Sequence, residues 1–184
     1  CVILISQSTV AGTAAKKNPF GLIKNMIPAY TTAIGTQSSA ATIPVTVECT
    51  KKNGVTASIA EFVCPLCATI HLSGSTITLT SCSIAVLMMM GQPVTFGKMF
   101  PFILMLGITM VAAPGVPGGA VMAALGILQS MLGFDETMQG LMIALYIAQD
   151  SFGTACNVTG DGAIAVFMDS ITKKGKAKKE TTTV

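Results

Sequence analysis

Three side chains near the C-terminal end of the chain have a spacing that could bind a cation and a polar ligand. Asp150, Asn157 and Asp161 are seven and four residues apart, and at 3.6 residues per turn these offsets return to one side of a helix. They lie in an apolar segment that begins near Leu141. An ionised side chain at membrane depth costs about 2.5 to 3.5 kcal/mol, so such residues usually face an interior and a partner. The spacing therefore predicts a binding face inside a helix bundle.

The composition indicates a membrane protein. Of 184 residues, 51% are hydrophobic and 10% are charged, whereas soluble domains are about 25% charged. A buried helix of a soluble protein, with capped or paired aspartates, is the alternative for the aspartate segment and fits this charge deficit less well. The 11 basic residues are all lysine and stand in short runs at the ends of apolar blocks. They do not follow one face, which argues against nucleic-acid binding.

Two apolar stretches carry chain breakers in their middle. Residues 20–47 contain GTQSSAATIP, and residues 100–132 contain APGVPGG at 113–119. Their halves fall short of the about 20 residues that cross roughly 30 Å of hydrocarbon, whereas 56–90 and 137–172 are long enough. Irregular backbone survives at membrane depth only where protein or a watery cavity satisfies its polar groups. The breakers therefore predict hairpin tips that line a site, with a tight turn or a helix-packing contact as the alternative.

The lysines predict how these stretches cross the membrane. If both interrupted stretches return to the side from which they came, every lysine except Lys98 falls on one side. The positive-inside rule makes that side cytoplasmic, together with the C-terminus. The predicted fold is an all-α membrane protein with two re-entrant helical hairpins of opposite orientation, each followed by a transmembrane helix. Such an inverted repeat with matching discontinuous helices indicates a transport site.

The remaining segments are the two ends. Residues 1–15 are apolar but too short to span alone, and we expect them to be the end of a truncated transmembrane helix. Residues 16–172 form the predicted core. Residues 173–184 are polar and lysine-rich, which predicts a disordered cytoplasmic tail. No nucleophile and base form a coherent site, so the sequence does not predict an enzyme.

Four motifs together resemble a known family. SSAATIP, PLCATIHLSGS, APGVPGGAV and DSFGTACNVTGD occur in this order, and they look like the C-terminal core of the dicarboxylate/amino acid:cation symporter (glutamate transporter) family. The resemblance implies hairpin 1 at 20–47, helix 7 at 56–90, hairpin 2 at 100–132 and helix 8 at 137–172. It also implies a fragment, because the family's first six helices and trimer-forming scaffold are absent, except for the end of helix 6.

The resemblance implies a set of substrate contacts. The residue matching Asp150 binds the α-amino group of the substrate, and the residue matching Asn157 binds its α-carboxylate. The other implied contacts come from both hairpin tips and from helices 7 and 8: Ser38, Ser39, Ser75, Gly115, Gly153 and Thr154.

It also implies two sodium sites. The side chain of Asp161 binds one ion with backbone carbonyls of Asn157, Cys67 and His71. The second ion uses backbone carbonyls alone: Thr69 and the hairpin 2 tip from Met110 through Val111 to Ala113. Oxygen ligands suit a hard cation such as Na⁺.

The chain departs from the family pattern at four positions. His71 and Ser73 stand where the family has asparagine and aspartate, so the carboxylate of an additional sodium site is lost. A lone histidine is more often a hydrogen-bonded packing residue, but coupling to H⁺ is the alternative. Relatives that carry acidic substrates place an arginine at the position of Gly153 or near Gln37. Because the chain has no arginine, recognition of an acidic side chain is not expected.

The sequence thus predicts a sodium-coupled symporter for neutral amino acids of the serine, threonine or alanine type, in the cell membrane. Its expected partners are an amino acid and the lipid bilayer, with no nucleic acid, and the full-length protein is expected to form a homotrimer through the scaffold. The alternatives are a symporter for acidic amino acids or C4-dicarboxylates, and a truncated fragment without function.

Overall fold

The computed structural model describes the backbone of residues 2–182 and the side chains of residues 2–175. Within these residues the fold is all-helical, as the sequence predicts. Its eight helices are α1 (Val2–Ala15), α2 (Pro19–Thr36), α3 (Ser39–Lys52), α4 (Ala57–Ile70), α5 (Ser73–Met89), α6 (Phe96–Met110), α7 (Gly119–Leu132) and α8 (Glu136–Thr182).

Local sequence signals set several helix boundaries. Pro19 occupies the first turn of α2, where its missing N–H is not needed, and the Asn18 side chain accepts from the N–H of Phe20. Asp135 accepts from the N–H of Met138 and so caps α8. Residues next to each boundary thus determine where α2 and α8 begin.

Each interrupted stretch forms a pair of antiparallel helices. In the first pair, α2 and α3 are joined by residues 37–38 alone, a much shorter break than GTQSSAATIP suggests. The reason is that Ser38 caps α3 by accepting from the N–H of Ala41, so the helix resumes at once and includes Pro44. In the second pair, α6 and α7 are joined by residues 111–118.

The stretch predicted as one helix at 56–90 is two helices. The chain is not helical at His71 and Leu72, between α4 and α5. Ala57–Met89 is nevertheless the one stretch among the described residues that is long and apolar enough to cross a membrane, while α1, α6 and α7 are shorter apolar helices.

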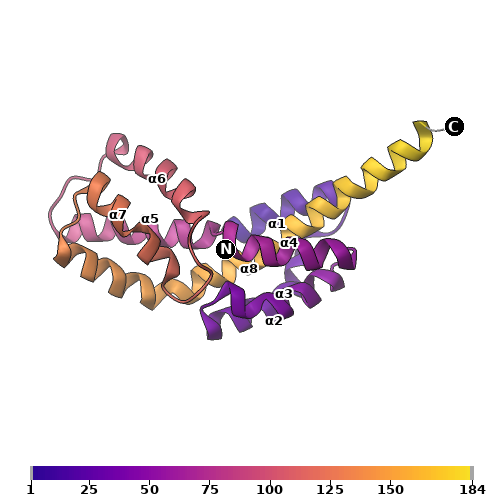
Figure 1. The fold of residues 1–184 in the computed structure, drawn as a ribbon, viewed down its shortest axis with the longest axis horizontal. Helices are drawn as coiled ribbons and strands as arrows, with labels where there is room; N and C mark the ends of the chain where they lie inside the picture. The colour runs from indigo at the N-terminus through magenta and orange to yellow at the C-terminus, as the bar shows by residue number, and fades with distance from the viewer. Residues whose placement is uncertain (1, 183–184) are drawn as a thin grey trace.

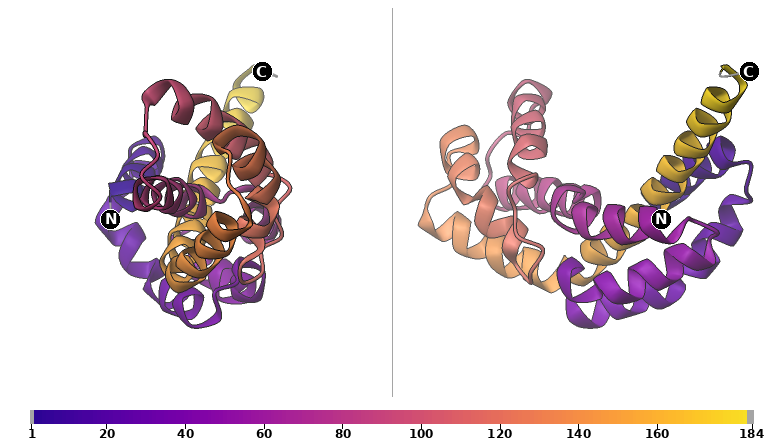
Figure 2. Two further views of the ribbon diagram at one scale, coloured as in Figure 1. Left: turned by 90° about the vertical axis from the view of Figure 1, so that its left-hand side faces the viewer. Right: turned by 45° about the vertical axis from the view of Figure 1, so that its right-hand side comes forward.

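Helix α8 runs through the whole fold and divides it into two lobes (Figure 1). Helices α5, α6 and α7 pack with its first half around buried residues such as Phe102, Leu128 and Tyr146. Helices α1 to α4 pack on its second half, where Cys64 and Val166 are buried. The two helical pairs approach from opposite ends and their tips meet near the middle of α8 (Figures 1 and 2).

The end of α8 differs from the predicted disordered tail at 173–184. The structure continues the helix to Thr182, and its last turns project away from both lobes (Figure 1). Lys173 and Lys174 bond to Asp169 and to the carbonyl oxygen of Ala14, which supports the helix just past the apolar segment. The last two residues of the predicted tail lie outside the described residues.

Candidate functional site

Three breaks in the helices converge on the middle of α8. From the first tip, Gln37 Nε2 donates to Ser151 Oγ at 2.8 Å. From the second, the N–H of Gly118 donates to Asp150. From the break between α4 and α5, His71 Nδ1 lies 2.8 Å from Asp161 Oδ1. Non-helical backbone and buried polar side chains therefore gather along α8 between Asp150 and Asp161.

Asp150 is buried and already has two donors. The N–H of Gly118 donates to Oδ2 at 2.8 Å, and Thr154 Oγ1 donates to Oδ1 at 3.3 Å. Gly118 has a φ of 70°, a conformation that favours glycine and that points its N–H at the carboxylate. The carboxylate thus sits where an ammonium group of a ligand could replace the hairpin N–H.

Asn157 caps the N-terminus of α5. Its Oδ1 accepts from the N–H of Gly74 at 2.8 Å, and its Nδ2 donates to Ser75 Oγ at 2.8 Å. The first N–H groups of a helix have no partner within it, and Leu72, the residue before α5, supplies no side-chain cap. To bind the α-carboxylate of a substrate as the resemblance implies, Asn157 would therefore have to share or give up its bonds to the N-terminus of α5.

We expect Asn157→Ala to destabilise the protein even without a ligand. The change leaves the buried N–H of Gly74 without an acceptor, which costs about 1–3 kcal/mol of the free energy of unfolding. Thermal denaturation of ligand-free protein measures the loss. An unchanged melting temperature would contradict the cap.

The two hairpin tips bind each other directly. The carbonyl oxygen of Gly115 accepts from the N–H of Ala40 at 3.1 Å and from Ser38 Oγ at 2.8 Å. A Cβ on Gly115 would lie 2.7 Å from the carbonyl oxygen of Ala68, so only glycine fits here. Ser39, the first residue of α3, is buried beside this contact. The tips are closed on each other in this structure.

Gly153 packs tightly on α5. A Cβ there would lie 3.2 Å from Thr78 Oγ1 and 3.4 Å from the Ser75 backbone. The two helices cross closely because Gly74 faces the Gly153 carbonyl oxygen. A cavity of about 300 Å³ adjoins Gly153 and Cys156, and a side chain at position 153 would need the Thr78 side chain and the adjoining part of α5 to shift by a few tenths of an ångström.

Asp161 is buried against the break between α4 and α5. Its Oδ1 bonds to His71, while its Oδ2 is buried without a partner. His71 also contacts Gln7 of α1, at 3.0 Å between the two Nε2 atoms. An unpartnered carboxylate oxygen in a buried site fits a hard cation, since Na⁺ takes oxygen ligands. Among the described residues no group of three His, Cys, Asp or Glu side chains gathers, here or elsewhere, so oxygen atoms of other kinds would have to complete a cation site at Asp161.

The other predicted cation ligands are placed less closely. Cys67 lies in the last turn of α4, and its carbonyl oxygen accepts from the N–H of His71 at 2.8 Å. Met110 and Ala113 are buried in the second tip, while Val111 and Thr69 are exposed. The second tip contacts the end of α4 through Gly115 and Ala68. Among the described side chains, Asp161 forms no hydrogen bond with any of Cys67, Thr69, Met110, Val111 and Ala113.

Comparison with known proteins accounts for this arrangement. The sequence profile of the sodium:dicarboxylate symporter family matches residues 1–171. The chain belongs to the sodium:dicarboxylate symporter family. Members of this family are transporters, not enzymes, as the sequence predicts.

The relatives within this family differ in the substrates that their names state. They include an excitatory amino acid transporter of Caenorhabditis elegans (30% identical over 159 residues), neutral amino acid transporter A of Homo sapiens (28% over 166) and the serine/threonine transporter SstT of Acinetobacter baylyi (31% over 175). The alignments cover 86%, 90% and 92% of this chain, but 31%, 31% and 44% of the relatives. The chain thus spans less than half of their length.

Sequence reasoning missed two members of the site. Gly118 is one of three glycines in APGVPGG, and the sequence does not show which of them adopts the backbone conformation that faces Asp150. Gln7 is the one amide in the apolar run VILISQSTVAG, and that isolation was a usable signal. A buried amide on an apolar helix needs a partner.

Proposed function

We propose that this chain is the transport core of a sodium-coupled symporter for neutral amino acids. The observation that carries the proposal is the convergence of two opposed hairpin tips and a third helix break on Asp150 and Asp161 of α8. Discontinuous helices meeting at buried polar groups are typical of transport sites. The family membership supports transport of a small molecule across a membrane.

The hydrogen bonds suggest how a substrate would enter. The second tip presents an N–H, from Gly118, to Asp150 and a carbonyl oxygen, from Gly115, to the start of α3. An amino acid could replace both groups, because its ammonium is a donor like the N–H of Gly118 and its carboxylate is an acceptor like the carbonyl oxygen of Gly115. We therefore propose that the second tip withdraws, that the substrate bonds to Asp150, Ser38 and Asn157, and that the tip closes over it. Sodium is co-transported at Asp161.

The exposed surface supports a place in the bilayer. Large apolar side chains are exposed on both lobes, including Phe20, Phe62, Phe96 and Ile108, and contiguous apolar surface marks contact with a membrane or another protein. We propose that both hairpins are re-entrant, that the lysine-rich side and the C-terminus are cytoplasmic, and that the longer protein is a homotrimer.

No lysine among the described side chains bonds to a residue of the substrate site, which supports a substrate with a neutral side chain. The chain has no arginine. Lysines with described contacts bond elsewhere: Lys17 to the turn at Gly54, Lys51 to Glu48 and Glu61, and Lys98 to the end of α7. A charged side chain would lose water without gaining a partner.

We expect serine, threonine and alanine to outcompete glutamate for uptake. Leaving one charge of a buried pair without its partner costs about 2–5 kcal/mol, so glutamate should need a concentration at least about 30-fold higher than serine. Competition assays measure this: the protein is reconstituted in proteoliposomes, an inward sodium gradient drives uptake of labelled serine, and unlabelled amino acids compete. Glutamate or a C4-dicarboxylate competing as well as serine would contradict the neutral class.

The converse variant is best made at Gln37. Its side chain already reaches Ser151, beside Asp150, whereas Gly153→Arg would press on Thr78 and the Ser75 backbone of α5. We expect Gln37→Arg to improve competition by glutamate and Gln37→Met, of similar length and neutral, to leave it poor. Equal competition by glutamate in both variants would show that charge at this tip does not set selectivity.

A further inference from the structure

Two buried atoms in the described side chains lack a hydrogen-bond partner, and both flank one imidazole. They are Gln7 Oε1, on α1, and Asp161 Oδ2, on α8. Gln7 and Asp161 each bond to His71 through their other polar atom. Buried polar atoms are nearly always satisfied, so an exception needs an explanation. Two exceptions at one place point to something that binds there.

The hydrogen bonds fix the orientation of the Gln7 amide. The carboxylate of Asp161 can only accept, so His71 Nδ1 carries the proton in this pair. In the neutral imidazole, His71 Nε2 accepts and Gln7 Nε2 supplies the donor at 3.0 Å; the second hydrogen of Gln7 Nε2 reaches Ser73 Oγ at 3.1 Å. Turning the amide over would set Oε1 against the accepting nitrogen. Gln7 Oε1 is therefore the oxygen left free.

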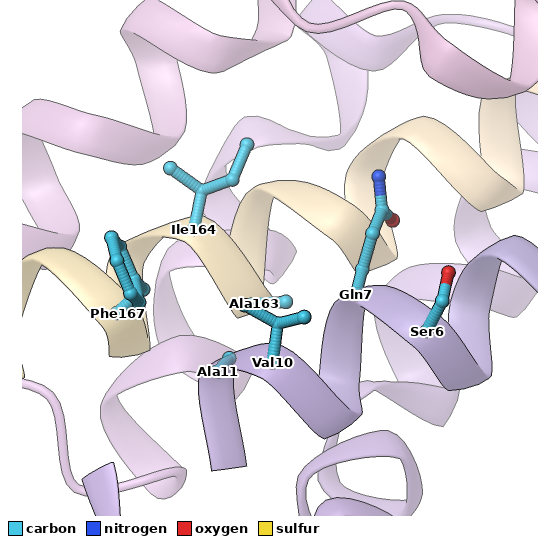
Figure 3. Close-up of a pocket in the computed structure, with 7 residues that line it drawn as sticks. All are labelled: Ser6, Gln7, Val10, Ala11, Ala163, Ile164 and Phe167. Atoms are coloured by element: carbon cyan, nitrogen blue, oxygen red, sulfur yellow. The ribbon is translucent and has the colours of Figure 1, made fainter. Parts of the chain in front are cut away.

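The free amide oxygen lies against the backbone next to Asp161. A Cβ on Gly160 would lie 2.5 Å from Gln7 Oε1 and would also collide with His71 Cε1. Glycine at this position lets both side chains approach α8 closely. Figure 3 shows Gln7 extending from α1 toward α8, at the edge of a cavity of about 270 Å³ that Val10 and Phe167 also line.

We infer that Gln7 supplies a side-chain ligand to the cation at Asp161, so that Gln7 Oε1 and Asp161 Oδ2 bind one Na⁺ together. Both free atoms are oxygen acceptors and one carries negative charge, which is the ligand chemistry of a hard cation. His71 acts as a positioning residue, since it holds both side chains by their other atoms. The inference rests on the proposed sodium coupling and extends the site to α1.

The test measures sodium binding without transport. Sodium stabilises a protein that binds it in the folded state, and the dependence of the melting temperature on concentration gives an apparent Kd. We would titrate the purified protein with NaCl at constant ionic strength, with choline chloride as the replacement. Gln7→Met keeps the length of the side chain and removes the oxygen. Changes next to a bound metal typically cost 10- to 100-fold in affinity, and we expect a loss of at least about tenfold.

Matched variants separate this role from packing. Ser6→Ala changes another polar residue that lines the same cavity, but Ser6 bonds only within α1, to the carbonyl oxygen of Ile3. We expect it to keep the wild-type Kd. Gln7→Asn retains the amide on a shorter side chain and should lose affinity as Gln7→Met does. In choline alone, Ser6→Ala should melt near the wild-type temperature, whereas the two Gln7 variants also lose the bonds to His71 and Ser73 and should melt lower.

The outcomes divide clearly. One outcome is that sodium stabilises the wild-type protein and that Gln7→Met has the same Kd for sodium. Gln7 Oε1 would then bond only to water, and this inference would be overturned while the proposed function stands. Wild-type protein that sodium does not stabilise more than choline would overturn sodium coupling itself, and this inference with it. A loss of affinity in Gln7→Met that is absent when His71→Ala is already present would confirm that His71 holds the ligand in place.

Discussion

Asp150→Ala should reduce the affinity for amino acids by about two to four decades. A ligand ammonium bound at this buried position would lose its counter-charge, and breaking a buried pair costs about 3–5 kcal/mol. The same change removes the acceptor for the N–H of Gly118 and for Thr154. The second hairpin tip would thus lose one of the groups that hold it closed in this structure, while its bonds from Gly115 to Ser38 and Ala40 would remain.

Binding of labelled serine at saturating sodium measures this prediction. Asp169→Ala is the matched control, because it also removes a buried carboxylate from α8. Asp169 bonds to the N–H of Thr56 and to Lys173 at the far end of the helix. Asp169→Ala should lower stability but leave the affinity for serine unchanged. Near-normal serine binding by Asp150→Ala would show that the amino group binds elsewhere.

Asp161→Asn should weaken sodium binding by at least about 100-fold while leaving the fold intact. That figure is the upper end of the range for changes next to a metal, and here the charged ligand itself is removed. The amide oxygen can still accept from His71 Nδ1, so the contact at 2.8 Å between α8 and the helix break survives. The variant therefore isolates the charge of the carboxylate from its structural bond.

The sodium dependence of the melting temperature and of serine uptake should both shift in Asp161→Asn. Serine binding at very high sodium should recover, since Asp150 and the hairpin tips are unchanged. Asp169→Asn again serves as the control outside the site. A wild-type sodium dependence in Asp161→Asn would rule out this carboxylate as the cation ligand.

The sequence by itself determined the helical fold and the approximate position of the two hairpin breaks. Runs of apolar residues interrupted by glycine, proline and serine predict interrupted helices, because glycine has no side chain to pack, proline has no backbone donor and the serine side chain competes for backbone hydrogen bonds. The offsets among Asp150, Asn157 and Asp161 likewise follow from helix geometry alone. The motif order was specific enough to indicate the family.

Local signals also misled where capping decided the outcome. GTQSSAATIP contains breakers over ten residues, yet the helix resumes after two because Ser38 caps α3. At His71 and Leu72 no glycine or proline marks the break. There α5 starts at Ser73 because Asn157, more than eighty residues later, supplies its cap.

Only the tertiary structure decided how the breaks are used. Three contacts depend on how distant segments meet. Gly115 bonds to the start of α3, Gly118 rather than another glycine faces Asp150, and Gly153 packs on α5. The role of Gln7 depends on two hydrogen bonds to residues more than sixty positions away. Helix periodicity acts within a few turns, whereas hydrogen bonds between helices form only once packing has brought their backbones together.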